Sequence, residues 1–248
     1  MRIRDTLLLT SIFISASFSS AHAVELDSGD KQVALVELFT SEGCSSCPPA
    51  DRWLSTLRND TRLWKSVVPI AFHVDYWDYI GWPDRFAVPA HAQRQRVHRE
   101  VGNVHSVYTP GFVVAGQEWR GWFRNPDLRL EQQPSAGRLR VKVSKSQLSV
   151  QYKPTGLTQS ADLELTFALL GMGLNTTVKA GENDGRNLAH DFVVLHTQRW
   201  KMQPGADGFV VMEKIRLPRT EAKELAVALW VSETGTQKPL QATGGLLN

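Results

Sequence analysis

Cysteine, excess charge and long apolar runs are all scarce in this sequence. Its 248 residues include two cysteines, which excludes a disulfide-rich miniprotein. The 28 Lys and Arg residues against 25 Asp and Glu leave a net charge of +3, too weak a bias to indicate nucleic-acid binding. Beyond the N-terminus, no stretch has the roughly 18 consecutive apolar residues of a membrane helix. With 42% hydrophobic residues, the chain is expected to bury a core in one or two domains.

The N-terminal residues have the three parts of a secretory signal peptide. The first four residues (MRIR) are basic, an apolar stretch covers 6–18, and residues 21–23 (Ala-His-Ala) match the small-residue cleavage pattern. The apolar stretch is too short to span a bilayer. We therefore expect a signal peptide over 1–23, cleaved after Ala23, and a periplasmic or secreted mature protein without a membrane anchor.

The two cysteines, Cys44 and Cys47, are separated by only two residues. In an oxidising compartment such a pair can close into a disulfide. This ring is a weak staple, because loop closure stabilises by about 2 kcal/mol for four residues and by about 4.7 kcal/mol for a hundred. The spacing therefore favours redox or metal chemistry over a purely structural role.

A strand, a helix and a second strand are predicted around the cysteines. The apolar runs 33–39 (VALVELF) and 67–74 (VVPIAFHV) indicate buried strands. A helix is predicted over 50–63, and the proline pair before it suits a first helical turn. This order is typical of a βαβ unit with parallel strands, and we expect an α/β domain over 31–130.

The same predicted domain contains an insertion and a hairpin. An aromatic segment covers 75–82 (DYWDYIGW), and a basic helix is predicted over 89–101. Two further strands are expected over 111–115 and 118–123. On the basic helix, we expect three arginines to lie on a solvated face: Arg94, Arg96 and Arg99.

The second half of the chain has a different pattern. Residues 131–138 (EQQPSAGR) have the composition of a linker, and beyond them apolar residues alternate with polar ones. Short runs of this kind, separated by turn residues, predict about seven strands. We expect a β-sandwich domain over 139–235.

The predicted helix N-terminus would make one cysteine reactive. Unpaired backbone N–H groups and the positive end of the helix dipole stabilise a thiolate, which is the attacking form of cysteine. We expect Cys44, the more exposed of the two, to be the nucleophile and Cys47, inside the first turn, to be the resolving thiol. Such a pair exchanges with protein or small-molecule thiols and disulfides, needs no cofactor, and works as an oxidant or a reductant.

Four stretches resemble a family of secreted bacterial proteins, domain of unknown function 1223. They are FTSEGCSSCPPAD (39–51), FHVDYWDYIGWPDRFA (72–87), SVYTP (106–110) and GENDGRNLAH (181–190). Residues 31–130 also resemble a thioredoxin-like domain, through the strand 36–39, the Cys-Ser-Ser-Cys motif and a later Thr-Pro pair. The fold expected on this basis is an α/β thioredoxin-like domain followed by an all-β sandwich, α+β overall.

The resemblance implies roles for three further residues. Pro110 matches the cis-proline that faces the dithiol, and Thr109 matches the residue whose backbone pairs with a substrate segment. Glu37 resembles a buried carboxylate that takes the proton of the resolving thiol. Its position is equally typical of an edge-strand carboxylate that faces water.

Two other functions would use the same cysteines. His73 lies at the end of the second predicted strand, and with Cys44 and Cys47 it makes a soft donor set suited to Cu or Zn. The protein would then be a metal-binding protein or metallochaperone. The other alternative is a non-enzymatic interaction module whose disulfide stays permanently oxidised.

Two segments have two interpretations each. The aromatic residues of 75–82 form either a rim for an unfolded or peptide partner or a second core, and the core is the commoner use of aromatics. The loop 182–186 is either a hairpin turn alone or also a contact with the redox domain. None of these patterns indicates an oligomeric state.

Overall fold

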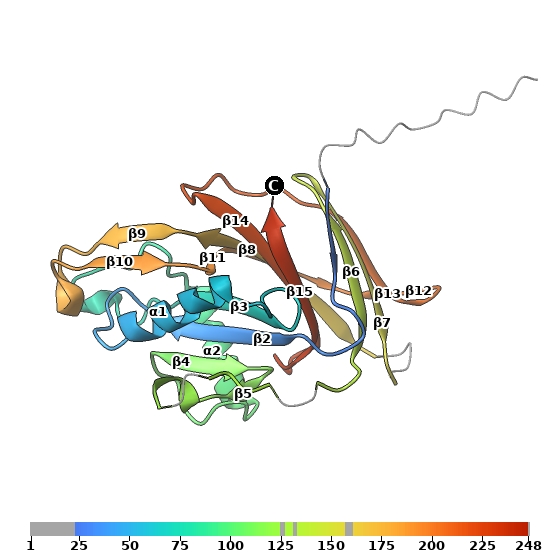
Figure 1. Ribbon diagram of the computed structural model, residues 1–248, viewed down its shortest axis with the longest axis horizontal. Coiled ribbons are helices and arrows are strands. Elements are labelled where there is room, and N and C mark those ends of the chain that lie inside the picture. The colour runs from blue at the N-terminus through green and yellow to red at the C-terminus, as the bar shows by residue number, and fades with distance from the viewer. Residues whose placement is uncertain (1–22, 125–126, 131–132, 157–160, 248) are drawn as a thin grey trace, which may run out of the picture.

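The computed structural model describes residues 23–124, 127–130, 133–156 and 161–247 (Figure 1). The signal peptide expected over 1–23 lies, except for Ala23, outside the described residues. The described part forms fifteen β-strands, two α-helices and four short 3₁₀ helices. None of its helices is long and apolar enough to cross a membrane.

One eight-stranded sheet contains strands from both halves of the sequence (Figure 1). In spatial order its strands are β15 (Pro239–Leu247), β14 (Glu224–Glu233), β8 (Leu163–Met172), β11 (Val193–Lys201), β3 (Val67–His73), β2 (Ala34–Thr40), β4 (Gly111–Val114) and β5 (Gln117–Glu118). β3 is parallel to both β2 and β11, and the other neighbours are antiparallel.

The expected fold class, an α/β thioredoxin-like domain followed by an all-β sandwich, is wrong. The protein is mostly β-sheet, with two α-helices in its described part, and is closer to a β-sandwich. The decisive pairing is that of Val193 in β11 with Ala71 in β3. Through this pairing, β11 lies next to β3, and β8, β14 and β15 follow β11 in the same sheet. Four strands from the second half of the sequence therefore extend the sheet formed by the first half.

A five-stranded antiparallel sheet packs on one part of the large sheet. Its strands, in spatial order, are β1 (Val24–Asp27), β6 (Gly137–Val143), β7 (Gln147–Pro154), β13 (Gly208–Lys214) and β12 (Gln203–Gly205). Leu139 and Val150 on this sheet form one core with Phe167 and Leu229 on the large sheet. The alternating burial of β6 fits a strand with one face on this core and one face in water.

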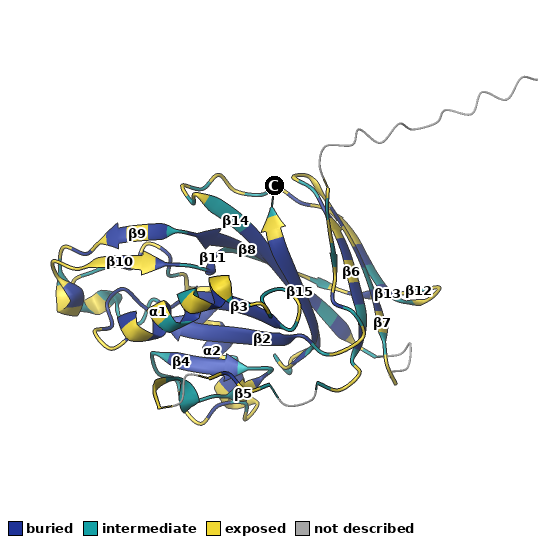
Figure 2. Cartoon of the chain, in the orientation of Figure 1, coloured by how far each residue is buried: buried dark blue, intermediate teal, exposed yellow. Residues whose placement is uncertain are grey.

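The central strands of the large sheet are covered on both faces, as Figure 2 shows by their dark blue colour. In β8, Phe167 and Leu169 face the core shared with the small sheet, while Ala168 and Leu170 face a second core. Alternation in the sequence places side chains on two faces but does not say what covers each face. For this reason the period-two pattern identified strands without revealing which sheet they join.

The strand, helix and strand predicted around the cysteines are confirmed as β2, α1 (Pro48–Thr56) and β3. The helix predicted over 50–63 is shorter than expected, because α1 ends at Thr56 and is followed by the 3₁₀ helix η1 (Leu57–Asn59). The predicted basic helix is confirmed as α2 (Pro89–Glu100). The two helices lie on opposite faces of β2: Leu38 packs in the core that contains Leu54 of α1, whereas Phe39 packs in the core that contains Ala92 of α2.

A separate hairpin extends beside α1 at one end of the molecule (Figure 1). It consists of β9 (Leu174–Thr177) and β10 (Asn187–His190), which pair antiparallel between β8 and β11 in the sequence. The short 3₁₀ helix η4 (Gly181–Asn183) lies at its tip. This hairpin brings residues from the second half of the chain to the cysteines.

Candidate functional site

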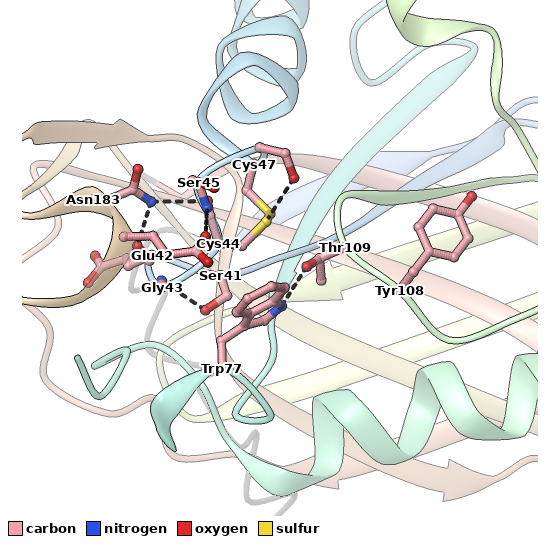
Figure 3. Close-up of a disulfide and its surroundings, with 12 residues drawn as sticks. Ser41, Glu42, Gly43, Cys44, Ser45, Cys47, Trp77, Tyr108, Thr109 and Asn183 are labelled. Carbon is pink, nitrogen blue, oxygen red and sulfur yellow. Dashed lines mark hydrogen bonds between the residues drawn. A yellow bond between two sulfur atoms is a disulfide. The ribbon is translucent and has the colours of Figure 1, made fainter. Parts of the chain in front are cut away.

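Cys44 and Cys47 form a disulfide between the end of β2 and the start of α1 (Figure 3). Their Cα atoms are 5.4 Å apart, and Cys47 is the N-cap residue of α1. Both residues are 0% exposed. The expectation of a more exposed Cys44, and of a Cys47 inside the first turn, is therefore wrong. Proline at the first helical position makes the helix begin after Cys47, and segments distant in sequence cover the loop.

A tight turn joins the two cysteines. The N–H of Cys47 donates to the carbonyl oxygen of Cys44 over 3.1 Å, and the N–H of Cys44 donates to the carbonyl oxygen of Ser41 over 3.2 Å. Ser45 and Ser46 are exposed, and Ser46 Oγ lies 3.4 Å from Cys44 Sγ. The two serines are thus the part of the motif that faces solvent.

The tip of the β9–β10 hairpin holds this turn from one side (Figure 3). Asn183 is fully buried, and its Nδ2 donates to the carbonyl oxygens of Glu42 (2.8 Å) and Cys44 (3.0 Å). Glu182 Oε2 accepts a hydrogen bond of 3.1 Å from the N–H of Ser45. The loop is therefore both a hairpin connection and a contact with the cysteine site, which confirms the second interpretation of its sequence.

Thr109 lies near the disulfide on another side (Figure 3). Its peptide bond to Pro110 is cis, as the resemblance implied. The Thr109 hydroxyl oxygen accepts a hydrogen bond of 2.7 Å from Trp77 Nε1. Thr109 is therefore brought to the cysteines, and Pro110 follows it immediately before β4.

Glu37 is not brought to the cysteines. It lies in the middle of β2, on the face covered by α2, where its Oε2 accepts a hydrogen bond of 2.6 Å from Arg94 Nε and lies 3.4 Å from His98 Nε2. Its neighbour Leu38 faces α1 instead. Burial raises the pKa of Glu37, but the charges of Arg94 and His98 outweigh it and lower the pKa to about 2. A carboxylate held ionised in this way is a poor proton acceptor.

Arg94 also departs from expectation. We expected a solvated arginine, but its side chain is 8% exposed and is paired with the fully buried Glu37. Its guanidinium also lies over the rings of Phe72 and Trp230. Arg96 and Arg99 are exposed, as expected. The helical pattern misplaced Arg94 because its partner lies on a strand far away in the sequence.

A cluster of buried ionisable side chains lies under the cysteine loop and the first turn of α1. His73 Nδ1 lies 2.7 Å from Asp84 Oδ2, and His190 Nε2 lies 3.4 Å from Glu42 Oε1. The two imidazole rings are 4.9 Å apart. Asp51 of α1 is buried close to both histidines. The three carboxylates of this cluster, Glu42, Asp51 and Asp84, were missed by sequence reasoning, although all of them fall within the stretches that resemble the family.

Electrostatics distinguishes the carboxyl groups of this cluster. Burial raises the pKa of Asp51 above its usual value. Burial also acts on Asp84, but the charge of His73 and its hydrogen bond outweigh it and lower the pKa of Asp84. The same pair raises the pKa of His73, although burial opposes this. The His73–Asp84 pair is therefore stabilised in its charged form.

The alternative metal set of Cys44, Cys47 and His73 gains no support from this geometry. The two sulfurs are bonded to each other, although His73 Nε2 is buried without a hydrogen-bond partner and only Nδ1 is paired, with Asp84. Within the described part of the chain, no three His, Cys, Asp or Glu side chains are arranged to hold a metal ion.

The aromatic segment divides between the two roles considered for it. Tyr76 and Trp77 pack against the core, and Trp82 Nε1 donates to Glu42 Oε2 over 2.8 Å. Tyr79, in contrast, is 82% exposed. Three of the four aromatic side chains therefore pack inside the protein or bond to the cysteine loop, and the ring of Tyr79 projects into solvent.

Comparison with known proteins identifies the family of this chain. A family model described as a protein of unknown function (DUF1223) matches residues 35–232. The chain belongs to the DUF1223 family. The match covers the cysteine motif, the buried ionisable cluster and the β9–β10 hairpin, so the whole site lies within the family's domain.

Two solved structures are similar to this DUF1223 protein. One, a structural-genomics protein of Agrobacterium tumefaciens, is 23% identical with a TM-score of 0.57, and the alignment covers 88% of this chain and 95% of that chain. The other, HBP35 of Porphyromonas gingivalis, is 17% identical with a TM-score of 0.63, over 88% of this chain and 76% of that chain. At these identities the likeness concerns the fold alone. No curated protein matches the sequence.

Proposed function

We propose that this protein is an exported thiol–disulfide oxidoreductase whose active pair is Cys44 and Cys47. One observation carries the proposal: the chain's two cysteines are bonded to each other at the N-terminus of α1. A ring this small contributes little as a staple, while a helix N-terminus stabilises a thiolate. Export by residues 1–23 belongs to the proposal, because an oxidising compartment keeps the pair in its disulfide form.

The reaction moves two electrons from a substrate dithiol to the disulfide. A substrate thiolate attacks Cys44 Sγ, the bond between Cys44 and Cys47 breaks, and Cys47 leaves as a thiolate that takes up a proton. The second substrate thiolate then attacks the mixed disulfide, and Cys44 leaves in turn. The substrate departs as a disulfide and the protein as a dithiol; in reverse, the same steps reduce a substrate disulfide.

The neighbours of the disulfide support separate parts of this proposal. Thr109 lies near the sulfurs, before the cis bond to Pro110 that precedes β4, and its backbone can meet a substrate segment there. Ser45 and Ser46 are the exposed residues that a substrate meets first. Glu37 has no part in this reaction, because it lies on the face of β2 that is turned away from α1.

Burial of both cysteines adds a requirement. A substrate thiolate must reach Cys44 Sγ along the axis of the disulfide, so the covering groups must move before exchange. Ser46 Oγ, which lies beside Cys44 Sγ, and the hairpin tip are among the groups in contact with the turn. We therefore propose that opening of this turn precedes the chemical step.

Turnover of a defined substrate tests the proposal. The mature protein is incubated with a reduced dithiol peptide and oxidised glutathione, and formation of the peptide disulfide is followed by mass spectrometry. We expect catalysis well above the rate with glutathione alone, and none from Cys44→Ser. The proposal is wrong if the wild-type protein accelerates neither oxidation of the dithiol peptide nor reduction of its disulfide above the rate with glutathione alone, and if its own disulfide stays oxidised throughout. The disulfide would then be permanent.

A further inference from the structure

The hairpin tip places a carboxylate directly on the turn between the cysteines. Glu182 Oε2 accepts a hydrogen bond of 3.1 Å from the N–H of Ser45, the residue that follows Cys44. Asn183 fixes the tip in this position through its two buried hydrogen bonds to the same loop. Interactions with the Ser45 hydroxyl and then with its backbone N–H lower the pKa of Glu182, so this carboxylate is ionised at neutral pH.

This contact opposes the formation of a thiolate at Cys44. Backbone N–H groups near a helix N-terminus lower the free energy of a thiolate by hydrogen bonding and by their partial positive charge. The N–H of Ser45 is already donated to Glu182. The carboxylate also adds a negative charge beside the position where a second negative charge would form.

We propose that Glu182 is a tuning residue that disfavours the Cys44 thiolate and so makes the Cys44–Cys47 pair a weaker oxidant. The inference rests on the proposed function, because it concerns the reactivity of the same dithiol. The sign follows from the redox equilibrium: a less stable thiolate makes the reduced protein less stable, and the disulfide form is then favoured.

Other charged groups around the loop do not replace Glu182 in this role. They are buried, whereas Glu182 is exposed, and they approach from α1, the end of β3, β10, the loop after β2 and the loop before α2: Asp51, His73, His190, Glu42 and Asp84. On the hairpin, Arg186 donates to Asn183 Oδ1 over 2.9 Å. These groups stay in place when an exposed side chain at the tip is changed.

Glu182→Gln tests the proposal, because it removes the charge and keeps a side chain of the same shape. We expect the midpoint pH for alkylation of reduced Cys44 to fall. In a glutathione redox buffer, we expect the equilibrium to move about two- to fivefold toward the reduced protein, the range of a solvent-exposed charge contact. That change corresponds to a potential higher by about 9 to 21 mV, at 29.6 mV per tenfold. The differences between Glu182→Gln and the wild type, in alkylation midpoint and in redox equilibrium, should both shrink in 1 M NaCl.

Asp184→Asn is the matched control. Asp184 is the next acidic residue of the same tip and is exposed, and the N–H of Ser45 donates to Glu182 rather than to Asp184. If Glu182→Gln leaves the equilibrium unchanged, or if Asp184→Asn shifts it equally, Glu182 has no specific tuning role. The proposed function fails on a different result, the absence of turnover by the wild-type protein, because the glutathione equilibrium is measurable without a natural substrate.

Discussion

The side-chain amide of Asn183 donates a hydrogen bond of 3.0 Å to the carbonyl oxygen of Cys44, a residue 139 positions earlier in the chain. The same Nδ2 also donates to the carbonyl oxygen of Glu42. These contacts join the β9–β10 hairpin to the loop that carries the disulfide. The position of the cysteines therefore depends on a segment that lies far from them in the sequence.

Replacing Asn183 with alanine should loosen the cysteine loop. The carbonyl oxygen of Glu42 loses its side-chain partner, and an unsatisfied buried group costs about 1 to 3 kcal/mol. The carbonyl oxygen of Cys44 keeps the N–H of Cys47 as a donor. We expect a lower free energy of unfolding in urea and faster reduction of the disulfide by dithiothreitol, because the covering tip is released. Asn187→Ala is the control, since this exposed asparagine of β10 contacts Thr177 instead. Equal reduction rates for the two variants would show that the tip does not limit access.

Arg94→Ala should destabilise the fold without changing the redox equilibrium. It leaves the fully buried Glu37 without its guanidinium partner, and breaking a buried ion pair from one side costs about 3 to 5 kcal/mol. Arg96→Ala, at an exposed position of the same helix, should change the free energy of unfolding by less than about 0.5 kcal/mol. Because Glu37 lies on the α2 face of β2, the glutathione equilibrium of folded Arg94→Ala should match that of the wild type. A clear shift would place Glu37 in the exchange reaction.

The stability that Glu37 contributes through its charge should disappear in acid. Its pKa is about 2 in the folded protein, against the ordinary glutamate value of 4.5 that applies to an unfolded chain. A carboxyl group with a lowered pKa stabilises the fold fully above its unfolded pKa, and this contribution is lost as the pH falls from about 4.5 toward 2. We expect the difference in unfolding free energy between the wild type and Glu37→Gln to shrink over that interval. A difference that stays constant from pH 6 to pH 3 would contradict the ion pair.

Local structure around the cysteines could be predicted from the sequence because its signals are local. The apolar run 33–39 and the run 67–74 became β2 and β3, and the proline pair marked the start of α1. The disulfide followed from the spacing of the cysteines and the absence of other partners for them. The hairpin turn at 181–186 followed from its Asp-Gly pair.

The parts that could not be predicted depend on pairings between distant segments. The fold class changed because Val193 pairs with Ala71, and no periodicity in either strand encodes that contact. Glu37 was misplaced because a strand residue takes one of two faces, and the face is decided by α2. The cluster of His73, Asp84 and His190 is drawn from three separate segments that meet only in the folded protein.

Trapping of a mixed disulfide tests the central claim, that Cys44–Cys47 is an exchanging pair, most directly. The variants Cys47→Ser and Cys44→Ser are each incubated with a dithiol peptide in its oxidised form and quenched by alkylation, and the adducts are identified by intact mass and by peptide mapping. We expect Cys47→Ser to accumulate a covalent adduct through Cys44, because the resolving thiol is missing, and Cys44→Ser to accumulate much less. Absence of an adduct on Cys44, in a variant shown to be folded, would contradict the account.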